Sequence, residues 1–307
     1  AAELIHGALR EVIVGRPLEL GARFSEMKVR LRNLGQVGLG AMALSAVDVA
    51  LWDLHARLLG APLYTVLGAA RRRVPIYGSG GFTSYTLAEL SEQLGGWARA
   101  GIPRVKMKVG RAPAEDPTRV RAARRAIGDD TELFVDGNGA YGRSQSLAMA
   151  ARFAEERVVW FEEPVSSDDL SGLHAVRLRA PFGMEIAAGE YGWDAFYFRR
   201  MLEAGAVDVL QADATRSGGI TGFLQAAAIA DAYGVPLSAH CAPALHLHPC
   251  AAVLRFRHLE YFHDHARIEQ LFFDGAPRPE GGELIPDEGR PGLGLELKRR
   301  DAERYRS

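Results

Sequence analysis

Eight short apolar runs at nearly regular intervals restrict the fold of this sequence more than any other feature. From residue 74 onward they alternate with stretches of helix length, and each run ends near a polar residue. From Lys108 on, these polar residues follow one another every 20 to 28 residues. A strand–helix unit repeated eight times predicts parallel βα units closed into a barrel, with the polar ends gathered at one mouth. The runs occupy residues 74–80, 105–110, 132–138, 158–164, 184–190, 207–213, 236–242 and 258–262.

The regions on either side of the repeat predict two further parts. Residues 1–72 are expected to be helical, most clearly over 43–68, where apolar residues recur at helical spacing. Residues 73–262 would form the barrel. Residues 263–307 are rich in Pro, Gly and charge and are expected to leave the barrel and pack on another part of the molecule. The predicted fold class is therefore α/β, a TIM-type barrel with a helical appendage.

Composition excludes several classes of protein. With 307 residues, 48% of them hydrophobic, the chain can bury a large core, and its net charge of −1 gives no sign of a nucleic-acid partner. No uninterrupted apolar run reaches about 18 residues, so no membrane helix is expected. The first residues lack the basic and apolar regions of a signal peptide. The only cysteines, Cys241 and Cys250, favour a reducing cytoplasm over a disulfide framework.

Three carboxylates end consecutive runs. Asp136, Glu162 and Glu190 would meet at the mouth of a barrel, where they would repel one another unless a cation lay between them. Hard oxygen ligands from separate strands suit Mg²⁺. Unrelated surface acids are the alternative for any one of them. Alternation allows only one of Glu162 and Glu163 to point inward, and the residues alone do not decide which.

Two lysines lie on one face of the second run. Lys106 and Lys108 are two residues apart in a strand that has no solvent face in a parallel barrel. A second ammonium depresses the pKa of the first, and a lysine with a depressed pKa can serve as a general base. A solvent-facing pair on an edge strand is the alternative.

A histidine and an acid end neighbouring runs. A carboxylate such as Asp213, bonded to one nitrogen of His240, would fix the tautomer and raise the basicity of the other nitrogen. Glu260 ends the last run. If protonated it could donate a hydrogen bond to a developing oxyanion, and otherwise it is an ordinary strand-end acid. Among the later histidines, His246 is a candidate for the wall of the pocket. Two bases and a cation suit proton abstraction beside a carboxylate.

These residues carry a resemblance to the enolase superfamily, and within it to the mandelate racemase subgroup. The ordered motifs span roughly residues 40 to 290. The matching pieces are "KMK" (106–108), "DGN" (136–138), "EEP" (162–164), "AAGE" (187–190), "QADATRSGGITG" (211–222), "SAHCAP" (238–243) and "LEYF" (259–262). The resemblance implies a capping domain beside a (β/α)7β barrel. It also implies a Mg²⁺ cofactor, a small-molecule carboxylate substrate and a homo-oligomer, from dimer to octamer.

The resemblance also implies a role for each site residue. Asp136, Glu162 and Glu190 would bind Mg²⁺. Lys108 would be one acid/base, with Lys106 lowering its pKa and touching the substrate carboxylate. The opposite acid/base would be His240 with Asp213, and Glu260 would donate a hydrogen bond to the carboxylate. The candidate substrate contacts are Ser79, Asn138, Arg216 and His246.

The sequence departs from the family pattern in two places. The family's capping domain begins with a β-meander whose loop closes over the substrate, whereas this chain begins with a segment similar to the part after it. Arg216 stands where a lysine is common, which keeps the charge but not the geometry.

Two reactions fit the same residues. Dehydration of an acid sugar, which we favour, uses one base and a general acid, and racemisation uses Lys108 and His240 on opposite faces of the α-carbon. A zinc-dependent amidohydrolase would need a His-x-His at residues 74–80, which is missing. A phosphate-binding barrel would rest on the Gly-rich segment 216–222 alone. The remaining alternative is a non-catalytic, metal-binding homologue.

Overall fold

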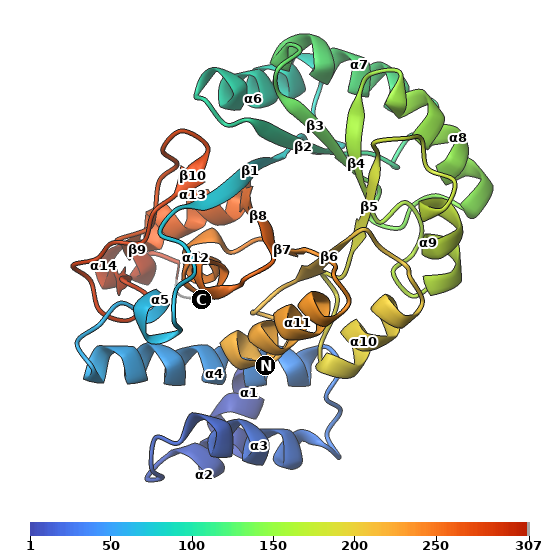
Figure 1. Cartoon of the computed structure of the whole chain (residues 1–307). Coiled ribbons are helices and arrows are strands. Elements are labelled where there is room, and N and C mark those ends of the chain that lie inside the picture. The colour runs from blue at the N-terminus through green and yellow to red at the C-terminus, as the bar shows by residue number, and fades with distance from the viewer. Residues whose placement is uncertain (306–307) are drawn as a thin grey trace.

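Eight parallel strands close into a barrel in the computed structural model, which describes residues 1–305 (Figure 1). The first strand pairs with both the second and the eighth, which closes the ring. The prediction of an α/β TIM barrel is therefore confirmed. The strands are β1 (Val74–Gly80), β2 (Arg104–Lys108), β3 (Glu132–Asp136), β4 (Val158–Glu162), β5 (Glu185–Ala188), β6 (Val209–Ala212), β7 (Leu237–Ala239) and β8 (Phe256–Phe262).

Helices surround the strands, and within the described chain one long helix lies between each pair of consecutive strands. Local sequence fixes several helix starts. Before α6, for example, the Thr86 side chain accepts the Glu89 backbone N–H while the Glu89 carboxylate accepts the Thr86 backbone N–H, a reciprocal capping pair. The helices are α6 (Leu87–Arg99), α7 (Asp116–Ile127), α8 (Arg143–Ala154), α9 (Leu170–Arg177), α10 (Ala195–Glu203), α11 (Gly219–Ala232) and α12 (Pro243–Ala252).

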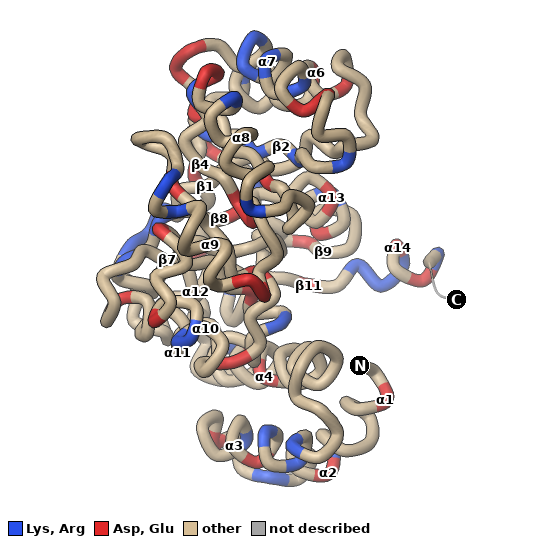
Figure 2. The backbone as a smooth tube through the Cα atoms, turned by 90° about the vertical axis from the view of Figure 1, so that its right-hand side faces the viewer, with Lys and Arg blue, Asp and Glu red and all other residues tan. Residues whose placement is uncertain are grey.

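The N-terminal residues form helices at one side of the barrel, and Figure 2 shows α2 and α3 lying beyond α4, away from the strands. Leu9, Met27 and Leu31 form a separate small core there. Basic and acidic residues are interspersed along the tube rather than gathered on one face. The elements are α1 (Ala2–Leu4), the π-helical turn η1 (Ile5–Leu9), α2 (Arg10–Ile13), α3 (Leu20–Leu31), α4 (Leu39–Leu58) and α5 (Leu63–Val66).

Helix α4 packs on α11 through buried polar contacts. The Ser45 hydroxyl accepts the backbone N–H groups of Gly218 (2.9 Å) and Gly219 (3.0 Å) at the start of α11. Asp48 accepts hydrogen bonds from the backbone and hydroxyl of Thr221. A Cβ at Gly219 would lie 2.5 Å from the Asp48 Cβ, and the φ of +74° also favours glycine. This junction fixes the N-terminal helices against the barrel.

By length and composition, α4 is apolar enough to cross a membrane, with a mean hydropathy of 1.2 over its most apolar window. The sequence-based expectation of no membrane helix rested on uninterrupted apolar runs, a stricter criterion. About half of that window, 44%, is buried in the structure, against α3 and α11 among others. Core helices of soluble proteins share this composition.

The residues after β8 first continue the barrel and then return to the N-terminal helices. Helix α13 (His263–Phe272) packs on β1 and β8. Farther on, the Leu63 N–H donates to the Gly292 carbonyl (2.7 Å), and the Leu293 N–H donates to Asp53 (2.7 Å). The remaining elements are β9 (Phe273–Asp274), β10 (Glu283–Leu284), which pairs with the start of β1, β11 (Glu296–Leu297), which pairs with β9, and α14 (Arg299–Glu303).

An aromatic layer fills the barrel interior one level below the strand ends. Tyr77, Phe134, Trp160 and His258 are each at most 1% exposed, and the Phe134 and Trp160 rings stack with their centroids 5.2 Å apart. Each lies two residues before a candidate site residue, so alternation points it to the same interior. This layer is the floor on which the site is built.

Candidate active site

The three predicted metal ligands meet at the C-terminal mouth of the barrel. Asp136 and Glu162 end β3 and β4 in register, and Glu190 follows β5 by two residues. One carboxylate oxygen from each lies within 4.8 Å of the others, and all three side chains are buried.

This cluster fits a hard divalent cation. Three buried carboxylates from separate strands provide the oxygen ligands that Mg²⁺ prefers, and their mutual repulsion calls for positive charge between them. The Glu190 Oε2 atom is also buried without a hydrogen bond among the described residues. A buried oxygen of this kind is available as a ligand.

The neighbouring Glu163 is a buried acid that sequence reasoning left out of the site. It is 1% exposed, and its φ of +38° breaks the strand alternation just after Glu162. Burial, with the nearby charge of Glu190, raises the pKa of Glu163 to about 10. The alternation rule therefore failed at this position because the strand ends one residue earlier.

The two lysines lie among these carboxylates. The Lys106 Nζ atom is 2.7 Å from both oxygens of Glu162 and 2.9 Å from Glu260 Oε1, and its side chain is fully buried. Lys108 donates a short hydrogen bond to Asp136 and is partly exposed at the mouth. The buried positive charge is thus paired with buried negative charge, as burial requires.

The protein groups alone do not produce the predicted depression of the Lys108 pKa. Burial and the Lys106 charge both act to lower it, but the negative charge of Asp136 outweighs them, and the pKa of Lys108 lies above its ordinary value. The sequence pattern placed the two ammonium groups together correctly. It did not weigh the carboxylate that the third strand brings to Lys108.

The expected histidine–acid pair is present at the ends of β6 and β7. The His240 Nδ1 atom lies 2.8 Å from Asp213 Oδ2, and the other Asp213 oxygen accepts two hydrogen bonds from Thr215. Burial acts to lower the pKa of His240, but the charges of Glu190 and Glu260 and the bond to Asp213 raise it to about 9. The His240 Nε2 atom is 3.2 Å from Glu190, so the pair adjoins the carboxylate cluster.

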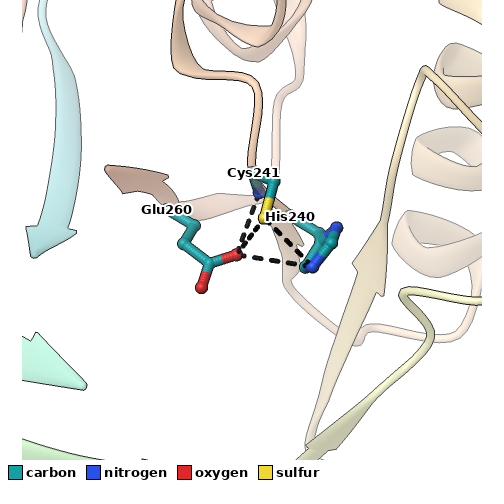
Figure 3. Close-up of side chains that lie close together, drawn as sticks. All are labelled: His240, Cys241 and Glu260. Atoms are coloured by element: carbon teal, nitrogen blue, oxygen red, sulfur yellow. Dashed lines mark hydrogen bonds and ion pairs between the residues drawn. The ribbon is translucent and has the colours of Figure 1, made fainter. Parts of the chain in front are cut away.

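Glu260 reaches the site from β8, and its role as a hydrogen-bond donor to the substrate carboxylate stays a prediction. Burial favours its neutral form, yet Lys106 and His240 hold its pKa well below the ordinary value. It therefore accepts, taking the Cys241 backbone N–H at 2.9 Å, as Figure 3 shows. The Cys241 side chain also lies here, and sequence reasoning did not consider it because it is one residue beyond the strand-end histidine.

The contacts of His246 argue against the predicted substrate contact. Its Nε2 accepts the Ala214 backbone N–H at 2.8 Å, and its Nδ1 donates to the Cys241 carbonyl at 2.8 Å. The ring is fully buried on α12. Both nitrogens are thus occupied by backbone groups, and we correct the assignment: His246 positions the loops that follow β6 and β7.

The other three candidate substrate contacts lie around the mouth. Ser79 is buried on β1 with a hydroxyl that has no hydrogen-bond partner among the described residues. Asn138 is exposed after β3, and its backbone N–H donates to Asp136 (2.8 Å). The Arg216 guanidinium lies over the Tyr191 ring, 5.2 Å from its centroid, and lines a cleft at the start of α4. Their roles toward a substrate stay predictions.

A closed βα barrel with carboxylates on β3 to β5, lysines on β2 and a His–Asp pair on β6 and β7 defines an enolase-like protein. Residues 89–302 match the model of the enolase C-terminal domain-like family, and residues 2–68 match that of the mandelate racemase / muconate lactonizing enzyme N-terminal domain. The chain therefore belongs to the enolase superfamily, in its mandelate racemase subgroup.

Named relatives and solved structures agree with this assignment. The chain is 35% identical over 267 residues to L-talarate/galactarate dehydratase of Salmonella typhimurium, covering 86% of this chain and 65% of that protein. It is 30% identical over 292 residues to arabinonate dehydratase of Saccharolobus solfataricus, covering 91% and 76%. The chain thus spans less than two-thirds of the length of the first of these relatives.

Among solved structures, a mandelate racemase/muconate lactonizing enzyme-like protein from Rubrobacter xylanophilus is similar with a TM-score of 0.96 and 56% identity, covering 98% of this chain and 84% of that one. A racemase from Streptomyces coelicolor with bound magnesium is similar with a TM-score of 0.92 and 30% identity, covering 99% and 83%.

Proposed function

We propose that this protein, with Mg²⁺ as cofactor, removes the proton α to the carboxylate of an acid sugar and eliminates the β-hydroxyl as water. One observation carries the proposal. Lys108 and the Asp213–His240 pair reach the same three-carboxylate cluster from different strands of the ring. The two named dehydratase relatives, which act on acid sugars by their names, support this class of substrate.

Asp136, Glu162 and Glu190 would hold the Mg²⁺ ion. When bound, the ion supplies Lewis-acid stabilisation of the charge that develops on the substrate carboxylate. The family's solved structures support the choice of metal, since one of them contains magnesium.

The proton transfers are assigned to side chains of this chain. Lys108 Nζ acts in its neutral form, after its pairing with Asp136 is released, and takes the α-proton. The electron pair of the broken C–H bond becomes a carbon–carbon double bond as the β-carbon–oxygen bond breaks. His240 Nε2 gives a proton to the departing hydroxyl, which leaves as water, and the resulting enol tautomerises to a 2-keto acid. Asp213 holds the His240 ring in the orientation that this step needs.

Racemisation of a 2-hydroxy acid is the second candidate, because Lys108 and His240 could each remove or return a proton at the same carbon. The similarity to a racemase from Streptomyces coelicolor favours it, whereas the curated relatives named above favour dehydration.

A screen of mono- and dicarboxylic acid sugars with Mg²⁺ tests the proposal, with formation of a 2-keto acid as the readout. We expect at least one substrate to lose water. If no sugar does so, but solvent deuterium enters the α-position of a 2-hydroxy acid without keto-acid formation, the dehydration proposal is wrong and racemisation stands. Lys108→Ala and His240→Asn provide the controls, since each should abolish keto-acid formation. Full activity in both variants would show that Lys108 and His240 are not the base and the acid of the reaction.

Three further expectations belong with this proposal. We propose residues 1–72 as the helical part of a capping domain, 73–262 as the catalytic barrel and 263–307 as the segment that returns to the cap, supported by the separate family match over residues 2–68. A homo-oligomer and a cytoplasmic location also stay proposals. Light scattering of the purified protein tests the first of these, and a fluorescent fusion of the whole protein tests the second.

A further inference from the structure

A thiol lies where the proposed function does not use one. Cys241 follows His240, and its Sγ atom is 3.2 Å from His240 Nε2 and 3.4 Å from Glu260 Oε2. The third side of this triangle, from His240 Nε2 to Glu260 Oε2, measures 3.7 Å. Figure 3 shows the three side chains converging from the end of β7 and from β8. All three are buried.

The size of this triangle matches one face of a tetrahedral zinc site. With Zn–S of about 2.3 Å and Zn–N and Zn–O of about 2.1 Å, neighbouring donor atoms of a tetrahedron lie about 3.4 to 3.6 Å apart. The three observed distances lie close to this range. Imidazole nitrogen, thiolate sulfur and carboxylate oxygen are also the donor types that Zn²⁺ accepts, whereas Mg²⁺ avoids sulfur.

Neighbouring groups hold two of the three donors, His240 and Glu260, in place. Asp213 binds the Nδ1 side of His240 at 2.8 Å, so Nε2 is the nitrogen that faces the triangle and can bind a metal once its proton is displaced. Lys106 takes Glu260 Oε1 at 2.9 Å, and the Cys241 N–H holds Glu260 Oε2. An acid behind a ligating histidine and hydrogen bonds to a ligating carboxylate are regular features of zinc sites.

A fourth donor is close by. Glu190 Oε2 lies 3.2 Å from His240 Nε2 and is buried without a hydrogen bond among the described residues. From its position beside the triangle, this oxygen can be the fourth ligand of the metal or a hydrogen-bond partner for a metal-bound water. It also places this site next to the three-carboxylate cluster, with Glu190 between the two.

We propose that His240, Cys241 and Glu260 form a binding site for a soft divalent cation, Zn²⁺ or its analogue Cd²⁺, and that occupancy of this site inhibits the enzyme. Binding replaces two protons, that of the Cys241 thiol and that on His240 Nε2, with a metal–sulfur and a metal–nitrogen bond, and both protons pass to solvent. The charges of thiolate and carboxylate balance that of the ion. Inhibition rests on the proposed function, because the metal occupies the nitrogen assigned to proton transfer. Binding of the cation to the three residues does not depend on the proposed function.

Titration of the intact protein with Cd²⁺ at saturating Mg²⁺ tests binding, with the ultraviolet thiolate-to-cadmium charge-transfer band as the readout. We expect one equivalent of Cd²⁺ to produce the band. Cys241→Ser should abolish the band and weaken Cd²⁺ binding by at least about tenfold, because loss of even an outer partner of a metal site costs that much. Cys250→Ser is the matched control, because Cys250 is the other buried thiol and lies on α12 away from the triangle. That variant should keep the band.

The possible results distinguish failure of the binding site from failure of its inhibitory role. A band that persists in Cys241→Ser, or no band at one equivalent of Cd²⁺, overturns the site. If the band depends on Cys241 but Cd²⁺ and Zn²⁺ inhibit Cys241→Ser as strongly as the unaltered protein, the binding site stands and its inhibitory role is wrong. If no acid sugar is dehydrated at all, the charge-transfer titration still decides the site, so its failure is distinguishable from failure of the proposed function.

Discussion

A buried histidine outside the candidate active site should make the stability of this protein depend on pH. His248 on α12 is 2% exposed; its Nδ1 accepts the Tyr64 N–H (3.2 Å), and its Nε2 donates to the Leu293 carbonyl (3.0 Å). The ring thus joins the N-terminal helices, the barrel and the C-terminal segment in its neutral form. Burial lowers the pKa of His248 from 6.5 to about 4.

The sign and size of the effect follow from linkage. Between pH 6.5 and 4 the unfolded chain binds a proton at this site that the folded chain does not, so the free energy of unfolding falls as the pH falls through that window. The shift of the pKa corresponds to about 2 kcal/mol lost by pH 5 and about 3 kcal/mol near pH 4. Above pH 7 His248 is neutral in both the folded and the unfolded chain, so its full contribution to the free energy of unfolding is present.

Urea unfolding of the unaltered protein and of His248→Gln, followed by tryptophan fluorescence from pH 7.5 to 4.5, isolates this contribution from all other titrating groups. Glutamine cannot make both hydrogen bonds, so at pH 7.5 the variant should be less stable by about 1 to 3 kcal/mol. That deficit should shrink by about 2 kcal/mol at pH 5, because only the unaltered protein carries the titrating ring. His6→Gln, at an exposed position, is the matched control and should show no such convergence. A deficit that stays constant across the range would refute the reasoning.

Three further changes test other parts of the structure. Glu190→Gln removes one charge from the carboxylate cluster and should weaken Mg²⁺ binding in calorimetry; unchanged affinity would argue against the three-carboxylate site. Trp160→Ala empties a fully buried position beside Phe134 and should lower the free energy of unfolding, measured by denaturant titration, by about 3 to 5 kcal/mol. An unchanged free energy of unfolding would mean that the aromatic layer repacks around the gap. Ser45→Ala leaves two buried backbone N–H groups unpaired at the start of α11 and should cost about 1 to 3 kcal/mol in the same assay, whereas no change would mean that α4 is held mainly by apolar contacts.

The sequence predicted the barrel and the convergence of its site residues well, because both depend on local periodicity. Strand alternation and a regular βα repeat place Lys108, Asp136 and His240 at one mouth without knowledge of any long-range contact. The ordered motifs then supplied the chemistry that each strand end carries.

Three properties that were missed or misjudged from the sequence depend on contacts between segments that the pattern of one strand does not contain. The pKa of Lys108 depends on the carboxylate of Asp136, 28 residues away in the chain. The ionised state of Glu260 depends on Lys106, and the occupied nitrogens of His246 depend on backbone groups of two loops. Electrostatic and hydrogen-bonding partners are set by the closed ring, so they became visible only with the structure.

The aromatic layer beneath the site places the buried charges against a packed, largely apolar surface. Trp160 donates its ring N–H to Glu162 at 3.1 Å, and the Tyr77 ring lies 5.2 Å from the Lys106 ammonium, so the layer meets the buried charges directly. The four side chains of the layer are almost completely buried, so they pack against the charged groups on the side opposite the mouth. A cover over the mouth would therefore enclose the reacting carbon between itself and an aromatic layer, and would strengthen the electrostatic interactions in between by excluding water.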